Sequence, residues 1–313
     1  MNIILLRRTV AAGALVLLGC FSSQAQSAGP TLYGLTFFGN QLVSVEPTNG
    51  AGALVGSLNA TVSGYGIAAR YGRLYTFDPN TDEIVEINPA TGVPGNSISI
   101  GVTNLVGEGD LAFRSDGTGF LVSALHTNGT VADDFYTFDV IAGTSHRVGT
   151  SSGPIDALAF DQNNTLYALG QDGTNLYTIS QSDGTMTVVG SLGVAMSSPF
   201  AAMTFGPDGT LYAAINDQLY TINKNTGAAS VLSTNVLDIG FSSISGLAFA
   251  VPPSGVRLTL TPEAGNLVLY WSAMGYTLQS ATNVVGPYTT ADFQANPSRI
   301  SPTNSQMYFR LEQ

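Results

Sequence analysis

The chain has 313 residues, of which 44% are hydrophobic and only 10% are charged, and its formal net charge is −11. Ordinary globular domains carry about 25% charged residues, so this composition favours an exported, all-β protein over a cytosolic helical enzyme. The negative charge would repel a phosphate backbone, which argues against nucleic acid as a partner. The length leaves room for two domains.

The first 28 residues have the pattern of an export signal. Arg7 and Arg8 precede an apolar run from Val10 to Leu18, and small residues follow around Ala25 to Ala28. The apolar run is about half of the roughly 20 residues that a membrane-spanning helix needs, so we expect no transmembrane span.

Cys20 is the only cysteine, and it ends the string Leu17-Leu18-Gly19-Cys20, which resembles a bacterial lipobox. Two alternatives are open for this residue. Signal cleavage leaves Cys20 as a lipidated N-terminus, or cleavage after Ala25 or Ser27 removes it. We therefore expect an exported protein, either secreted or held at the outer cell surface by a lipid anchor. In both cases the folded part contains no disulfide.

An internal repeat of four short strands is the strongest pattern in the sequence. One copy has runs at 156–160, 164–169, 175–179 and 185–190, and the next has runs at 201–205, 209–214, 218–222 and 229–233. Each run alternates apolar with small or polar residues, the period of a half-buried strand. The breaks between runs are rich in Asn, Asp and Gly, which close hairpins. Four antiparallel strands in about 40 to 45 residues are typical of a β-propeller blade.

The repeat predicts five blades, because inner strands are expected around five positions: Ile67, Leu111, Leu158, Met203 and Leu247. The first copy supplies only three strands, near 32–35, 42–45 and 54–57. We expect Ile244 to Ala250, at the other end of the repeats, to complete it. This exchange of an N-terminal for a C-terminal strand would close the ring and remove its open edges.

The Leu-Ala-Phe and Gly-Thr-Leu-Tyr motifs of these repeats resemble those of secreted bacterial β-propellers. The resemblance covers about residues 30–251. It implies the fold and leaves the function open, since propellers serve as binders, scaffolds and enzymes.

A second, smaller module is expected after the proline-containing linker at 252–255. Its Leu-x-Leu-x-Trp271 run, its Tyr276-Thr-Leu-Gln-Ser string and its final Tyr-Phe-Arg-Leu resemble small fibronectin-III-like β-sandwiches of verrucomicrobial-type secreted proteins. The expected division is a signal peptide at 1–28, the propeller at 29–251 and the β-sandwich at 256–313. The resemblance implies an accessory or attachment role. Trp271, Tyr276, Tyr308 and Phe309 are its expected core.

The mouth of the central channel is the usual ligand site of a propeller. Asp110 precedes one Leu-Ala-Phe motif, we expect Asp156 in the matching place of the next repeat, and Glu108 lies two residues before Asp110. Carboxylates converging there would suit Ca²⁺, the one cofactor considered, or would orient a sugar. The alternative is that each Asp accepts N–H groups of a neighbouring loop. Other repeats carry different residues here, so one off-centre site is expected.

The remaining polar motifs give little support for catalysis. His126 is expected in a long insertion and His146 on an outer strand, both away from the channel. Asp133 and Asp134 are expected at a solvated loop tip, and the Tyr of each Leu-Tyr pair is expected in packing. No phosphate-binding loop, nucleophile elbow or zinc-binding motif occurs.

Three hypotheses on function follow. The first is a monomeric, non-catalytic protein that binds an extracellular protein or glycan. The second is a hydrolase or lyase acting on carbohydrates or lactones through carboxylates or a metal at the channel mouth. The third is a structural protein of an envelope or matrix. The absence of a catalytic motif favours the first.

The predicted ring closure has a direct test. Deletion of residues 244–250 should remove the strand that completes the first repeat and should abolish soluble, cooperatively melting protein. Truncation at Pro253 should leave the repeats folded. Size-exclusion chromatography and thermal melting of the two variants check this, and a soluble deletion variant that melts like the truncated chain would contradict it.

Overall fold

The computed structural model describes residues 4–8, 15–16, 29–59, 61–124, 132–171, 173–196, 200–233, 243–251, 258–263, 266–271, 276–292, 294–300 and 306–312. These residues form strands joined by turns, and none is helical. The chain divides into two compact units, Gly29–Pro252 and a second unit that combines Met1–Ala28 with Pro253–Gln313. In the described residues no helix is long and apolar enough to cross a membrane.

Five four-stranded antiparallel sheets make up the larger unit, and we number them sheet 1 to sheet 5. Sheet 1 contains β22 (Ile244–Ala250), β3 (Thr31–Thr36), β4 (Gln41–Val45) and β5 (Gly52–Ser57). Sheet 2 contains β6 (Tyr65–Arg70), β7 (Arg73–Asp78), β8 (Glu83–Ile87) and β9 (Pro94–Ser99). Sheet 3 contains β10 (Leu111–Phe113), β11 (Gly119–Ala124), β12 (Asp133–Asp139) and β13 (Thr144–Thr150). Sheet 4 contains β14 (Ile155–Phe160), β15 (Leu166–Gly170), β16 (Asn175–Ile179) and β17 (Met186–Ser191). Sheet 5 contains β18 (Ala201–Phe205), β19 (Leu211–Ile215), β20 (Gln218–Ile222) and β21 (Ala229–Ser233).

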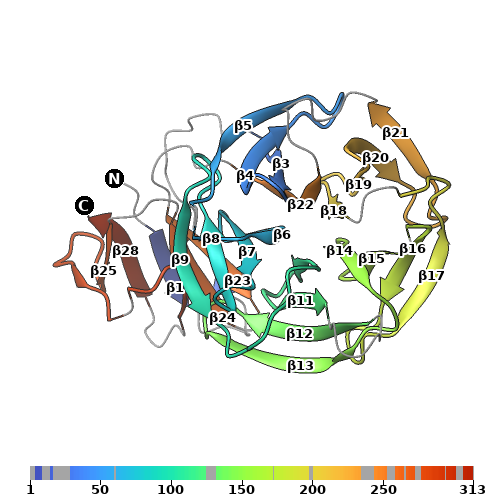
Figure 1. Ribbon diagram of the computed structural model, residues 1–313. Coiled ribbons are helices and arrows are strands. Elements are labelled where there is room, and N and C mark those ends of the chain that lie inside the picture. The colour runs from blue at the N-terminus through green and yellow to red at the C-terminus, as the bar shows by residue number, and fades with distance from the viewer. Residues whose placement is uncertain are drawn as a thin grey trace. The chain divides into compact units, whose positions relative to one another are not determined.

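The sheets stand around a common centre, with the first strand of each sheet innermost and the last outermost (Figure 1). The inner strands contact one another in the cyclic order β6, β10, β14, β18, β22 and back to β6. This is the arrangement of a β-propeller.

Sheet 1 combines strands from both ends of the unit. β22 pairs antiparallel with β3, with Gly246 opposite Leu35 and Ala250 opposite Thr31. The inner edge of β3, which would otherwise offer unpaired backbone groups, is therefore covered by β22.

Apolar cores lie between consecutive sheets and follow from the alternation of the strands. Leu35 and Leu42 of sheet 1 pack with Leu74 and Ile87 of sheet 2. The same kind of core joins sheets 3 and 4, sheets 4 and 5, and sheets 5 and 1. Of the Leu-Tyr tyrosines, Tyr33, Tyr75, Tyr167 and Tyr220 are buried, and the partly buried Tyr177 and Tyr212 pack against the cores between sheets, as expected of packing residues.

The smaller unit has two sheets. One contains β23 (Leu258–Glu263), β24 (Asn266–Trp271) and β27 (Ser298–Ile300). The other has the order β2 (Leu15–Val16), β1 (Ile4–Arg8), β28 (Gln306–Glu312), β25 (Thr277–Ala281) and β26 (Thr289–Thr290).

Its core includes Trp271 and Phe309, which are 3% and 0% exposed, together with Leu269 and Leu278. Tyr276 packs against this cluster from its edge, and Tyr308 is buried as well. β1 pairs with β28, with Ile4 opposite Phe309, so part of the predicted export signal contributes a strand to the sheet.

Gly246 offers a test of how closely the inner strands approach. A Cβ at this position would lie 2.4 Å from the backbone nitrogen of Ile67 and 2.6 Å from the carbonyl carbon of Gly66. Gly246→Ala should force β22 away from β6 and destabilise the fold by about 1–3 kcal/mol. That corresponds to a fall in Tm of several degrees in a unit of this size.

Gly153→Ala is the matched control, because its added Cβ would meet only the Met186 sulfur, at 3.7 Å. Thermal melting of both variants is the measurement. Equal melting temperatures would contradict the close approach of β22 and β6.

Candidate functional site

A cavity of about 150 Å³ lies at the centre of the larger unit. Three consecutive residues of each inner strand line it: Ile67–Ala69, Leu111–Phe113, Leu158–Phe160, Met203–Phe205 and Leu247–Phe249. These triplets coincide with the Leu-Ala-Phe motif of the repeat. The residues just before them therefore mark one end of the channel, which we call the channel mouth.

The triplets correct the expected alignment of the two aspartates. Asp110 immediately precedes Leu111 and thus corresponds to Ala157, whereas Asp156 lies one residue earlier in its repeat. One residue, Ala157, separates Asp156 from its Leu-Ala-Phe motif, whereas Asp110 directly precedes its own. Asp156 also falls on a β-bulge, since the pairing of β14 with β15 shifts between Ile155 and Ala157. The two carboxyl groups therefore have different environments.

Asp110 is committed to backbone hydrogen bonds. Its side chain is 1% exposed; Oδ1 accepts the N–H of Leu111 at 2.8 Å, and Oδ2 accepts the N–H of Leu158, on the next inner strand, at 2.9 Å. Burial raises its pKa well above the ordinary value, and the two N–H groups act in the opposite direction. Asp110 thus ties β10 to β14, and both of its donors belong to inner strands rather than to the neighbouring loop that the alternative expected.

Asp156 is buried too, at 6% exposure, but its Oδ2 atom has no hydrogen-bond partner. Burial raises its pKa to about 8, the Gln171 side chain opposes this by a hydrogen bond, and the charges of Glu108 and Asp133 raise it further. Gln171 also donates through Nε2 to Glu108 Oε2 at 3.2 Å. The Gln171 amide therefore connects two carboxyl groups, and Oδ2 of Asp156 is buried without a hydrogen-bond partner.

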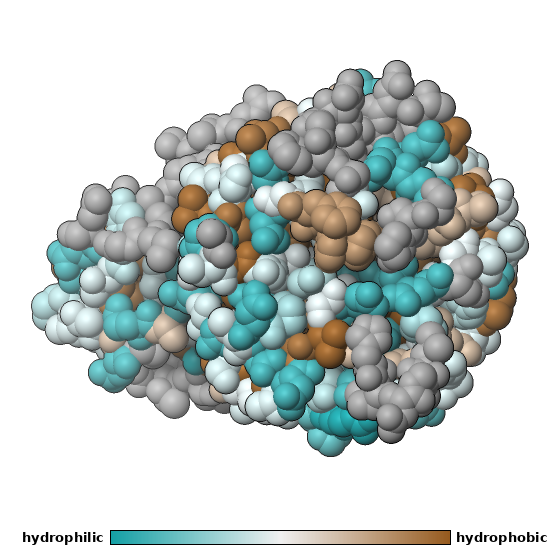
Figure 2. Space-filling model, in the orientation of Figure 1, coloured by the Kyte–Doolittle hydropathy of each residue, from teal (hydrophilic) through white to brown (hydrophobic). Residues whose placement is uncertain are grey.

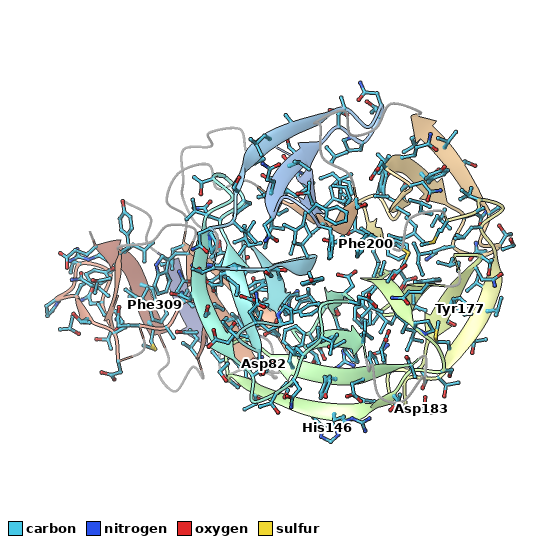
Figure 3. The ribbon with its side chains drawn as sticks, viewed as in Figure 1. Asp82, His146, Tyr177, Asp183, Phe200 and Phe309 are labelled. Atoms are coloured by element: carbon cyan, nitrogen blue, oxygen red, sulfur yellow. The ribbon has the colours of Figure 1, made fainter. Side chains whose placement is uncertain are left out.

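Four aromatic side chains gather beside this acidic group. Phe37 stacks on Phe200 with ring centroids 3.9 Å apart and meets Tyr65 edge-on at 5.3 Å. Phe38 contacts both Phe37 and Phe200, at 4.8 and 6.0 Å, and is 69% exposed. Figure 3 labels Phe200 close to the middle of the ring, and Figure 2 shows a brown patch at the same place. We call Phe37, Phe38, Tyr65 and Phe200 the aromatic cluster.

Tyr65 joins the aromatic cluster to the carboxyl groups. A Cβ at Gly107 would lie 2.5 Å from the Tyr65 hydroxyl, so this ring rests against the segment that carries Glu108. Burial raises the pKa of Tyr65, and the charges of Glu108 and Asp78 raise it further. The aromatic cluster and the acidic residues therefore belong to one mouth.

The structure corrects the expectation for Asp133 and Asp134, because both lie on strand β12. Asp133 is 2% exposed, and its Oδ2 accepts the N–H of Ile155 at 2.6 Å. Asp134 binds the Arg147 guanidinium. Strand β12 begins at Asp133, so Asp133 and Asp134 do not belong to the loop that was predicted to contain them.

Asp133 belongs to a repeated contact that sequence reasoning missed. A polar side chain at the turn before the third strand of a sheet, or at the first residue of that strand, accepts an N–H from the segment at the start of the next inner strand. The four contacts are Asn40 to Gly64 at 3.2 Å, Asp82 to Leu105 at 2.7 Å, Asp133 to Ile155 at 2.6 Å and Asp217 to Ser243 at 2.6 Å. The recurrence of Asn or Asp at equivalent positions of the repeat is the sequence pattern that could have predicted these contacts. The contacts hold the backbone segments at the channel mouth.

The other expected residues lie elsewhere. His146 is on the outer strand β13 and exposed, which confirms the prediction, and Figure 3 shows it at the rim of the ring. His126 and Cys20 lie outside the described residues. Within the described part of the chain no three His, Cys, Asp or Glu side chains are grouped to hold a metal ion. Calcium binding stays a prediction.

Comparisons with known proteins give no functional assignment. No family model matches the chain, and no curated protein matches it. Among solved structures, a gluconolactonase from Xanthomonas campestris is 14% identical, covers 91% of this chain and 86% of its own, and has a TM-score of 0.46. Nidogen, solved with laminin, is 10% identical over 72% of this chain and 99% of its own, with a TM-score of 0.48. A putative gluconolactonase is 9% identical over 78% and 86%, with a TM-score of 0.44. These likenesses are too distant to carry an argument about function.

The environment of Asp156 predicts a pH dependence of stability. Its pKa is about 8 in the folded chain against the ordinary aspartate value of 3.8, so between these two pH values the folded state holds a proton that the unfolded state has lost. The free energy of unfolding should therefore fall as the pH rises from about 4 to about 8.

Asp156→Asn should flatten this part of the profile, since the amide does not titrate. The contribution of Asp110, which has the same sign, should remain. The control is Asp183→Asn, at a fully exposed site where hydrogen bonds lower the pKa. Urea unfolding at several pH values measures the slopes, and an unchanged slope in the Asp156 variant would contradict this environment.

Proposed function

We propose that this chain is an exported, non-catalytic binding protein that recognises a small ligand or a glycan at the channel mouth of a five-bladed propeller. One observation carries the proposal. An exposed aromatic cluster and a buried acidic oxygen without a partner meet at the same end of the inner strands. Ligand sites combine such apolar surfaces with a few directed polar groups.

The architecture supports this location. The five sheets and the pairing of β22 with β3 fit a closed ring of five blades, in which every inner strand begins at the same mouth. We take the strands of both chain ends to be one blade. Export through the segment at 1–28, with removal or lipidation of Cys20, a monomeric state and an accessory role for the C-terminal module belong to the same proposal.

The mouth suits binding better than catalysis because its carboxyl groups are unequally available. Asp110 uses both oxygens for backbone N–H groups and cannot act on a ligand without giving up a contact between inner strands. Glu108 and Asp156 share the amide of Gln171. Oδ2 of Asp156 is buried without a hydrogen-bond partner, and a single acceptor of this kind suits recognition.

Hydrolysis of a glycoside or a lactone is the second candidate, and one observation favours it. With a pKa of about 8, Asp156 is protonated at neutral pH and can serve as a general acid, with Glu108 as the second carboxyl group. Loss of hydrolysis of a lactone or aryl-glycoside panel in both Asp156→Asn and Glu108→Gln would support this candidate.

The binding proposal is tested at Phe38, whose exposure makes it dispensable for folding. Phe38→Ser should weaken binding of any mouth ligand by about five-fold, because an aromatic contact is worth about 1 kcal/mol, and should leave the melting temperature unchanged. Val188→Ser is the control, since Val188 is 57% exposed on the outer strand β17.

The measurement is a glycan array and a small-molecule melting screen of the wild type, followed by titration of the hits against both variants. Hits that respond equally to both substitutions would contradict a mouth site. A wild type without hits in either screen would favour the structural hypothesis.

A further inference from the structure

We infer that the channel mouth selects a ligand that carries a protonated amine next to a ring-shaped or apolar body. The inference rests on the proposed binding function and names the chemical class of its ligand. It depends on which hydrogen-bonding groups at the mouth are used by the protein and which are left for a ligand.

The acidic side of the mouth lacks a donor. Oδ2 of Asp156 is buried and has no hydrogen-bond partner, although a buried carboxyl oxygen without a donor is costly. The Gln171 side-chain amide is shared between Asp156 and Glu108, and the two N–H groups near Asp110 are bound by Asp110 itself. A ligand that supplies an N–H or O–H donor would therefore remove an existing penalty.

Charge favours an ammonium group over a hydroxyl as that donor. The charged groups that act on Asp156 are Glu108 and Asp133, and both disfavour its ionised form. Asp156 in turn disfavours the ionised form of Asp110. A cation placed at Oδ2 would favour the ionised form of Asp156 and would be attracted by the charges of Glu108 and Asp133, and the net charge of −11 would draw cations toward the protein.

The aromatic cluster suits the same ligand. A cation is attracted by the face of an aromatic ring within about 6 Å, and Tyr65 lies between the other aromatic rings and the Glu108 segment. Phe38 offers its exposed surface to the body of the ligand. An anion would meet only acidic and apolar groups here, and a metal ion would need more ligands than the described residues group together.

The test uses two probes that differ only in the donor: 2-phenylethylamine, whose amine is protonated at neutral pH like that of lysine, and 2-phenylethanol. Both are titrated into the full chain at pH 7 by NMR and calorimetry. The amine should bind at least ten-fold more tightly than the alcohol. Its binding should release protons, because Asp156 ionises on contact with the cation, so the heat should depend on the ionisation enthalpy of the buffer.

Three variants locate the effect. Asp156→Asn should remove the preference for the amine and the proton release, and Phe38→Ser should weaken both probes equally. Glu108→Gln should reduce the preference, and it keeps the test usable if Asp156→Asn fails to fold.

Equal affinity for the two probes, preference for the alcohol, or no binding of the amine would each overturn the inference. Equal affinities that still respond to Phe38→Ser would leave the proposed binding function standing. The proposed binding function is tested separately by the ligand screen described above. It would be contradicted if every ligand responded equally to Phe38→Ser and Val188→Ser.

Discussion

The antiparallel pairing of β22 with β3 is the constraint on which the rest of the larger unit depends. It joins strands from the two ends of the repeats into one sheet, with Leu247 opposite Gly34 and Phe249 opposite Leu32. The inner strands can then contact one another in a closed order, and each apolar core lies between two neighbouring sheets. Without this pairing, β3 and β22 would each present an open edge, and the packing of sheets 5 and 1 would lose its support.

The same constraint places unlike residues at one mouth. Because each inner strand begins at the same end of the channel, Phe200 before β18 can meet Phe37 between β3 and β4, although the two are far apart in sequence. Asn and Asp side chains at the turns hold the segments that lead into four of the inner strands. These hydrogen bonds hold the backbone of the channel mouth in place, while the side chains at the mouth differ from repeat to repeat.

The sequence predicted the strands well because the repeat contains both the alternation of strands and the turn residues. Where prediction failed, the exact position of a residue relative to its strand was responsible. Asp156 lies one residue further from its Leu-Ala-Phe motif than Asp110 does, and the early start of β12 moved Asp133 from a loop to a buried strand position. The aromatic cluster could not be foreseen, because Phe37 and Phe200 lie in connecting segments where no periodicity applies. The unequal hydrogen bonding of Asp110 and Asp156 likewise depends on backbone positions that only the folded chain defines.

Hydrogen exchange of individual backbone amides tests the closed ring most directly. If β3 and β22 form one sheet that closes the ring, their amides should exchange only through global unfolding, at the same free energy as those of β15 in sheet 4. Protection of β3 and β22 should also fall in parallel as urea is added. Rapid exchange of β3 and β22 while β15 stays protected would contradict a ring held by its two chain ends.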